Sequence, residues 1–160
     1  MAGTCETKSP GPKALYLEIT DRCNMACPMC ITRHHRTDDA GENLLDPDQI
    51  RGRILEPGRE LGLKTLVISG GEPLMSPLFQ DTLRTAKNMG YRLYLATNLY
   101  HVEAGLMEWL VREMDSPEHT LQFSFDSMEP GKMNRIRGGN VYGEVLSNVR
   151  KLMDLRRKMN

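Results

Sequence analysis

The chain has 160 residues, of which 39% are hydrophobic and 26% are charged, so it is long enough for one domain with a sizeable core. Its 21 basic and 21 acidic residues cancel, and this balance argues against a nucleic acid or an anionic membrane as partner. Residues 1–13 are polar, without the apolar run of a signal peptide, and no later stretch is apolar enough to span a bilayer. We therefore expect a cytoplasmic domain over residues 14–160, preceded by a flexible tail over residues 1–13.

Four short runs of apolar and β-favouring residues predict buried parallel strands, because strands that are covered on both faces are nearly continuous in such residues. They cover residues 15–19, 65–68, 93–96 and 121–125. Helical patterns lie between them, and this alternation predicts right-handed βαβ units around a parallel sheet. The expected fold class is α/β, with about four parallel strands and the helices outside.

The first helix is predicted from the signals at its N-terminus. Asp46 is a good N-cap, Pro47 suits the first helical position, and Gln49 completes a capping box. Pro57 and Gly58 should end or kink this helix, because proline lacks the amide hydrogen and glycine is a poor helix former.

Three further helices follow along the chain. One begins at Ser76-Pro77 and stops at Gly90, and the next covers residues 103–114. The last begins near Asn140. Its apolar face is predicted to contain Val145, Val149 and Leu152.

Unusual residues follow each predicted strand, at the point where the strand ends. The cysteines of residues 23–30 come after the first strand, residues 70–73 after the second, residues 97–98 after the third, and Ser124 with Asp126 at the end of the fourth. The carboxyl ends of parallel strands meet at one edge of a sheet, where ligands bind in α/β folds. We therefore expect a single site built from separate loops.

Cys23, Cys27 and Cys30 are spaced as C-x3-C-x2-C. Thiolates are soft ligands that suit iron–sulfur clusters, zinc or cuprous copper, and three of them can hold a cubane cluster while leaving one iron open. Zinc is the alternative, because His34 would complete a Cys3His ligand set. Disulfides are less favoured without a secretion signal, and Cys5 in the tail is expected to be a bystander.

Gly70, Gly71, Glu72 and Pro73 follow the second predicted strand. Glycine permits positive φ and lets the backbone approach a ligand closely, and Pro73 stiffens the exit from the turn. A tight strand-to-helix turn without a ligand explains the same residues, so this motif becomes informative only together with the cysteines.

Together the two motifs resemble those of the radical S-adenosylmethionine (SAM) superfamily. The resemblance implies part of a (βα) barrel and a [4Fe–4S] cluster on the three cysteines, whose open iron binds the amino and carboxylate groups of SAM. One electron, from a donor such as flavodoxin or ferredoxin, then cleaves the carbon–sulfur bond, and the resulting 5′-deoxyadenosyl radical abstracts a substrate hydrogen. The resemblance further implies that the backbone of residues 70–73 receives the amino group of SAM, with Glu72 fixing the turn.

Residues 124–127 and 135–139 are similar to the S-x-D and R-x-R-G stretches of the subgroup that often carries a C-terminal SPASM or twitch extension. This resemblance implies that Ser124 and Arg137 hold the carboxylate of SAM, since the planar fork of arginine suits that task. It also implies that Asn98 and Asp126 lie near the ribose or the substrate. The alternatives are that Asn98 only shapes a turn and that Asp126 caps a helix.

Two other features bear on the site. Met29 stands where many relatives have an aromatic residue that borders the adenine, and its thioether can still pack against a ring. The basic run over residues 33–36 is typical of a solvated surface loop, with contact to an anionic substrate as the alternative.

The sequence predicts four strands, whereas the barrel of the family normally has six. We therefore expect the N-terminal part of a longer protein, or a barrel completed by another chain, with the fourth strand as an exposed edge. The expected substrate is a peptide or a small metabolite. Two other classes stay open: a zinc-stabilised binding module, and a fragment that binds SAM without turning it over.

Overall fold

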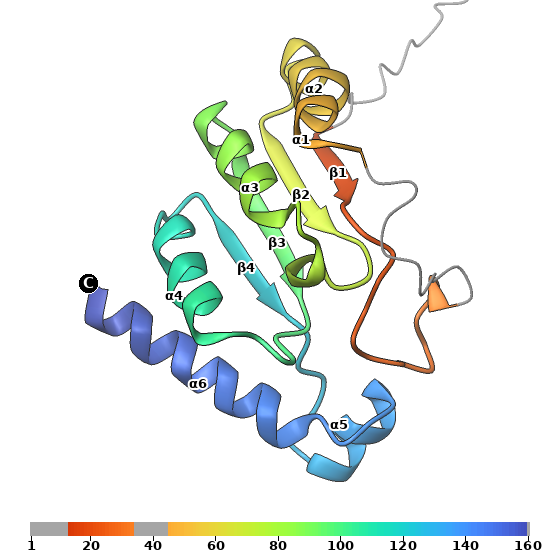
Figure 1. Ribbon diagram of the computed structural model, residues 1–160. Helices are drawn as coiled ribbons and strands as arrows, with labels where there is room; N and C mark the ends of the chain where they lie inside the picture. Colours follow the sequence, from red (N-terminus) through yellow and green to blue (C-terminus); the bar gives the residue numbers. More distant parts are fainter. Residues whose placement is uncertain (1–12, 34–44, 160) are drawn as a thin grey trace, which may run out of the picture.

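Four parallel strands form one sheet in the computed structural model, which describes residues 13–33 and 45–159 (Figure 1). Each neighbouring pair is parallel, so all the carboxyl ends lie at one edge. The α/β class and all four predicted strands are confirmed. The described residues do not include the tail over residues 1–12, which contains Cys5. They also do not include His34, the predicted zinc ligand and a member of the basic run. In the order in which they lie, the strands are β1 (Ala14–Glu18), β2 (Thr65–Ser69), β3 (Arg92–Thr97) and β4 (Thr120–Phe123).

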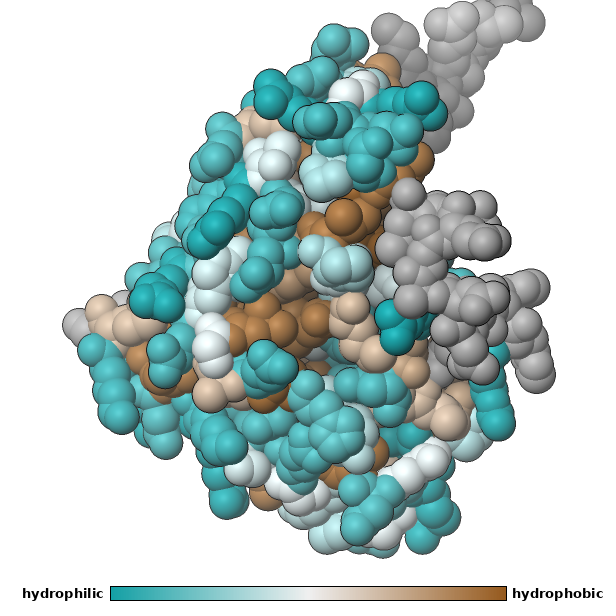
Figure 2. All heavy atoms as spheres, viewed as in Figure 1, coloured by the Kyte–Doolittle hydropathy of each residue, from teal (hydrophilic) through white to brown (hydrophobic). Residues whose placement is uncertain are grey.

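The main hydrophobic core lies between one face of the sheet and the helices that cover it (Figure 1). Figure 2 shows hydrophilic side chains around the outside of the molecule and hydrophobic ones in the middle of this view. Side chains alternate between the two faces of a strand, so Tyr16 of β1 points to the opposite face, where it is 73% exposed. The buried strand residues of the core are Leu17, Leu66, Ile68, Leu93 and Leu95.

The first helix begins as the sequence predicts and continues through Pro57 and Gly58. Asp46 Oδ1 accepts a hydrogen bond from the Gln49 amide at 2.8 Å, and Gln49 Oε1 accepts one from the Asp46 amide at 3.2 Å, which completes the capping box. The helix does not end at Pro57, because a π-helical turn precedes it and places the proline in the first turn of the next segment, where no amide hydrogen is needed. The consecutive segments are α1 (Pro47–Ile50), η2 (Arg51–Leu55) and α2 (Glu56–Glu60).

Most later helices lie close to their predicted positions. Ser76 accepts a hydrogen bond from the Leu78 amide at 3.3 Å, so the helix that it introduces begins slightly later than predicted. Helix α5 is not among the predicted helices, although it carries the usual signals: Pro130 in its first turn and Gly138 as its left-handed C-cap. None of the helices in the described part of the chain has both the length and the apolar composition of a membrane-spanning helix. The helices are η3 (Pro73–Met75), α3 (Phe79–Asn88), α4 (Ala104–Glu113), α5 (Pro130–Arg137) and α6 (Tyr142–Met159).

Gly58 allows Tyr91 to reach the backbone of the first helix. A Cβ atom on Gly58 would lie 2.5 Å from the Tyr91 hydroxyl oxygen. That hydroxyl donates a hydrogen bond to the Leu55 carbonyl at 2.6 Å, and Tyr91 is only 2% exposed. This buried bond ties the irregular helix to the residue that precedes β3.

Replacing Tyr91 by Phe should lower the free energy of unfolding by about 1–3 kcal/mol, because the buried Leu55 carbonyl loses its donor. Tyr16→Phe is the matched control and should change stability by less than about 0.5 kcal/mol, because that ring is exposed. Urea unfolding of the chain measures both. Equal stability of Y91F and the wild type would show that this bond does not hold the helix in place.

Candidate functional site

The loops after all four strands border one cavity of about 320 Å³. The structure therefore brings together most of the residues that the sequence singles out. Pro73 and Asp126 are not among the lining residues, and Met29 lies at the cavity with 53% of its surface exposed. The predicted residues that line the cavity are Cys23, Cys27, Cys30, Gly70, Gly71, Glu72, Asn98, Ser124 and Arg137.

Of the three cysteines of the cavity, Cys27 is buried and the other two are partly exposed. Each sulfur lies near a polar group, which suits a thiolate. Two polar residues of the site, Thr32 and Asn24, are not among the predicted site residues. Their signal in the sequence is their position next to the cysteines. The polar neighbours are Asn98 Nδ2 at 3.7 Å from Cys23 Sγ, Arg137 Nη1 at 3.9 Å from Cys27 Sγ, and Thr32 Oγ1 at 3.2 Å from Cys30 Sγ.

The turn after β2 packs directly on the backbone that leads into the cysteines. The Gly71 amide donates to the Thr20 carbonyl at 2.7 Å, and the Glu72 amide donates to the Arg22 carbonyl at 2.7 Å. A Cβ atom on Gly71 would lie 2.0 Å from that Arg22 oxygen, whereas Gly70 has a positive φ of 125°. At Gly71 the chain therefore approaches the protein's own backbone closely, and the residue also borders the cavity.

The end of α5 makes a similar approach to the cysteine loop. Gly138 has a φ of 75°, and a Cβ atom there would lie 2.3 Å from the Ala26 carbonyl oxygen. Only glycine fits both the left-handed conformation and this distance. Two glycines distant in sequence thus hold the loop from residue 21 to Cys27 between them.

Glu72 is a buried carboxyl group, with only 2% of its surface exposed. It accepts hydrogen bonds from the Thr97 hydroxyl at 2.6 Å, the Asn98 amide at 2.7 Å and the Leu74 amide at 3.2 Å. Burial raises the pKa of Glu72 above its ordinary value, although these three hydrogen bonds act in the opposite direction. The side chain joins the turn after β2 to the end of β3.

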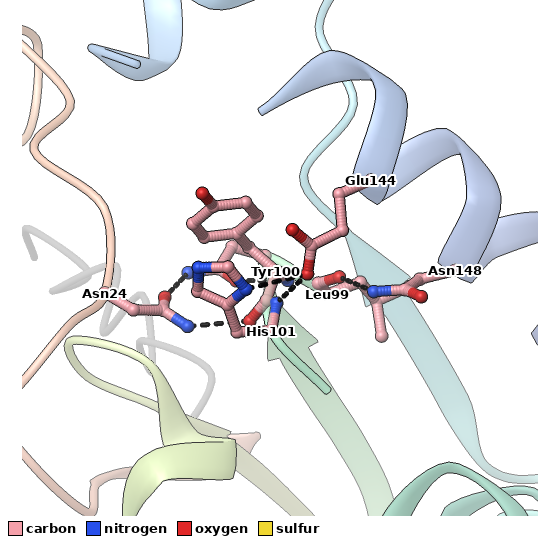
Figure 3. A network of polar contacts seen from close by, with 7 residues as sticks. Asn24, Leu99, Tyr100, His101, Glu144 and Asn148 are labelled. Carbon is pink, nitrogen blue, oxygen red and sulfur yellow. Dashed lines mark hydrogen bonds and ion pairs between the residues drawn. The ribbon is translucent and has the colours of Figure 1, made fainter. Parts of the chain in front are cut away.

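Residues 98–101 form a strained segment after β3. Leu99 and His101 have positive φ angles of 54° and 55°, and such a conformation costs of order 1–3 kcal/mol for each non-glycine residue. The segment persists because side chains from other elements hold its backbone (Figure 3). These bonds are Asn24 Nδ2 to the Tyr100 carbonyl at 2.6 Å, Asn148 Nδ2 to the Leu99 carbonyl at 2.9 Å, and the His101 amide to Glu144 Oε1 at 2.8 Å.

Asp126 and Arg137 form an ion pair at the edge of the cavity. Asp126 Oδ2 lies 2.5 Å from Arg137 Nε, and the side chains are 33% and 13% exposed. The alternative that Asp126 caps a helix is wrong, because the N-cap of α5 is Glu129. In this position the Asp126 carboxylate orients the Arg137 side chain.

Ser124 and Pro73 occupy different positions around this cavity. The Ser124 amide donates to the Thr97 carbonyl at 2.9 Å, so the residue continues the sheet beyond β4 and lies at the cavity. Pro73 is buried as the first residue of η3, outside the lining, and there it shapes the turn.

Comparisons with known proteins agree with this arrangement. A family model for the radical SAM superfamily matches residues 17–159. The GTP 3′,8-cyclase of Tolumonas auensis is 29% identical over 137 residues, which cover 84% of this chain and 39% of the relative. The tungsten-containing aldehyde ferredoxin oxidoreductase cofactor-modifying protein of Pyrococcus furiosus is 31% identical over 151 residues, which cover 92% of this chain and 40% of the relative. The chain thus spans about two fifths of the length of these relatives.

Solved structures share the fold. SuiB of Streptococcus suis bound to precursor peptide SuiA has a TM-score of 0.76 at 18% identity, covering 90% of this chain and 31% of that chain. SuiB bound to S-adenosylmethionine has a TM-score of 0.72 at 17% identity, covering 90% and 30% of the two chains. The chain belongs to the radical SAM superfamily, whose members use a [4Fe–4S] cluster and SAM.

The residues of the cavity fit these two cofactors. Three thiolates border one space, and hydrogen-bond donors lie near their sulfurs. A cubane takes each of the three thiolates on a separate iron. Together with membership of the family, this replaces the zinc-module interpretation.

Replacing Gly71 by Ala should lower the free energy of unfolding by about 1–3 kcal/mol and reduce the iron bound after reconstitution, because the new methyl group overlaps the Arg22 carbonyl. Gly105→Ala in α4 is the matched control, since nothing lies within 4 Å of its added Cβ. That change should leave stability unchanged or raise it by up to about 1 kcal/mol. Wild-type stability and iron content in G71A would contradict the close packing of this turn.

Proposed function

We propose that this chain forms the catalytic core of a radical SAM enzyme, in which Cys23, Cys27 and Cys30 hold a [4Fe–4S] cluster beside a bound SAM. The reduced cluster supplies the electron for reductive cleavage of SAM to a 5′-deoxyadenosyl radical, which abstracts a hydrogen atom from the substrate. One observation carries the proposal: a single cavity is bordered by all three cysteines, the turn after β2, Ser124 and Arg137.

The turn after β2 is proposed to receive the amino group of SAM through carbonyl oxygens. An ammonium group donates hydrogen bonds and needs acceptors. The amides of Gly71 and Glu72 are already bound to the carbonyls of Thr20 and Arg22. The turn therefore contributes its carbonyl oxygens to the ligand, while its amides keep it fixed on the cysteine loop.

Arg137 and Ser124 are proposed to hold the carboxylate of SAM. Asp126 fixes the Arg137 side chain through Nε, and Nη1 lies 3.9 Å from Cys27 Sγ. A carboxylate bound at this guanidinium would therefore lie close to the cysteines. This position suits a ligand whose amino and carboxylate groups both approach the open iron.

The substrate, the electron donor and the location are further parts of the proposal. We propose a peptide or a small metabolite as substrate, because one relative is named for action on GTP and SuiB is seen with a precursor peptide. We propose flavodoxin or ferredoxin as the electron donor. We propose a cytoplasmic location, because cysteine thiolates that hold an iron–sulfur cluster persist in a reducing compartment.

The function is tested by anaerobic reconstitution with iron and sulfide, followed by addition of SAM and dithionite. We expect about four irons and four sulfides per chain and formation of 5′-deoxyadenosine. Arg137→Lys should weaken SAM binding about ten-fold or more, because lysine keeps the charge but loses the two-pronged geometry. The dissociation constant is measured by equilibrium dialysis of the loaded chain.

Arg135→Lys is the matched control, because Arg135 lies in the same helix and is exposed. This change should leave the affinity for SAM unaltered. Equal effects of the two changes would reject the role of Arg137. A colourless chain with one tight zinc ion would contradict the whole proposal. A loaded chain that binds SAM but forms no 5′-deoxyadenosine would instead favour a SAM-binding fragment.

A further inference from the structure

The side-chain amide of Asn98 has one orientation that satisfies its neighbours. Its Oδ1 accepts a hydrogen bond from the Tyr100 amide at 2.8 Å, so its NH2 group faces the other way. There Nδ2 lies 2.8 Å from Asn24 Oδ1 and 3.7 Å from Cys23 Sγ. A backbone donor thus fixes which end of the Asn98 amide points to the sulfur.

The hydrogen bonds of Asn24 lead to the same orientation of the Asn98 amide. Asn24 Nδ2 donates to the Tyr100 carbonyl at 2.6 Å (Figure 3). Asn24 Oδ1 is therefore the atom that accepts from Asn98. One hydrogen of the Asn98 NH2 group is used by Asn24, and the second is directed toward Cys23. With one N–H of Asn98 bound to Asn24, its other N–H is the donor that faces the Cys23 sulfur.

The position of Asn98 is fixed by the elements around it as well. Its backbone amide donates to Glu72, and the strained residues Leu99 and His101 that follow are held from α6. Asn98 is 7% exposed, so water competes little for its NH2 group. Strained residues such as Leu99 and His101, which follow Asn98, are typical of functional sites.

We propose that Asn98 is a positioning residue that donates an N–H···S hydrogen bond to the Cys23 thiolate and thereby raises the reduction potential of the cluster. This inference rests on the proposed function. Reduction adds one electron to the cluster and moves no atoms, so the reduced form carries one more negative charge. A donor at a ligating sulfur stabilises that form more than the oxidised form.

Asn98→Leu removes the donor while keeping a side chain of similar size. In the reconstituted chain, the ratio of reduced to oxidised cluster at a fixed solution potential should fall about ten-fold, which is about 59 mV for a one-electron couple. An EPR-monitored titration with dithionite measures this ratio. Asn98→Asp keeps the acceptor for Tyr100 and places a carboxylate oxygen near the sulfur, so it should shift the potential in the same direction.

Asn148→Leu is the matched control. It removes another buried amide that holds the same segment, but the amide of Asn148 donates to the Leu99 carbonyl and not to a sulfur. Its potential should stay at the wild-type value. An equal shift in N148L, an unchanged potential in loaded N98L and N98D, or loss of the cluster from both Asn98 variants would overturn the tuning role. A wild-type chain that binds no cluster would reject the proposed function itself, which is a different result.

Discussion

The carboxyl group of Glu72 is the contact on which the geometry of the cavity depends. Its two oxygens bind the Leu74 amide in the turn after β2 and the Thr97 hydroxyl and Asn98 amide at the end of β3, while its own amide is bound to Arg22 beside the cysteines. One residue therefore joins the loops that follow three strands. Burial raises the pKa of this group, so the protein keeps a carboxyl in an unfavourable environment to maintain the connection.

The cysteine loop gains its shape from backbone packing. Gly71 and Gly138 let the turn after β2 and the end of α5 lie against residues 21–22 and 26–27 at distances that no side chain would allow. The backbone around the cysteines is thus constrained by the fold, and polar groups from β3 and α5 lie next to the sulfurs. A site built in this way has its ligands close to their working positions, which reduces the ordering that cofactor binding requires.

Local signals allowed much of this fold to be predicted from the sequence. The strands were visible as apolar runs, and the capping box of Asp46 and Gln49 involves neighbours three residues apart. The π-helical turn before Pro57 involves tertiary packing instead, because the Tyr91 hydroxyl lies against Gly58 and binds the Leu55 carbonyl. In the site, the motifs identified the residue types, but the contact of Gly71 with Arg22 could not be read from spacing. The pairing of Asp126 with Arg137 likewise depends on α5, because that helix brings Arg137 back to Asp126.

Amide hydrogen exchange of the cluster-free chain tests the central role of Glu72 most directly. We predict that the Asn98 amide is protected in the wild type and exchanges about ten-fold or more faster in Glu72→Gln, because a glutamine amide nitrogen cannot replace a carboxylate oxygen as acceptor. The Leu95 amide, inside β3, should exchange equally in both chains. An unprotected Asn98 amide in the wild type, or equal exchange in the two chains, would contradict a cavity held together by this carboxyl group.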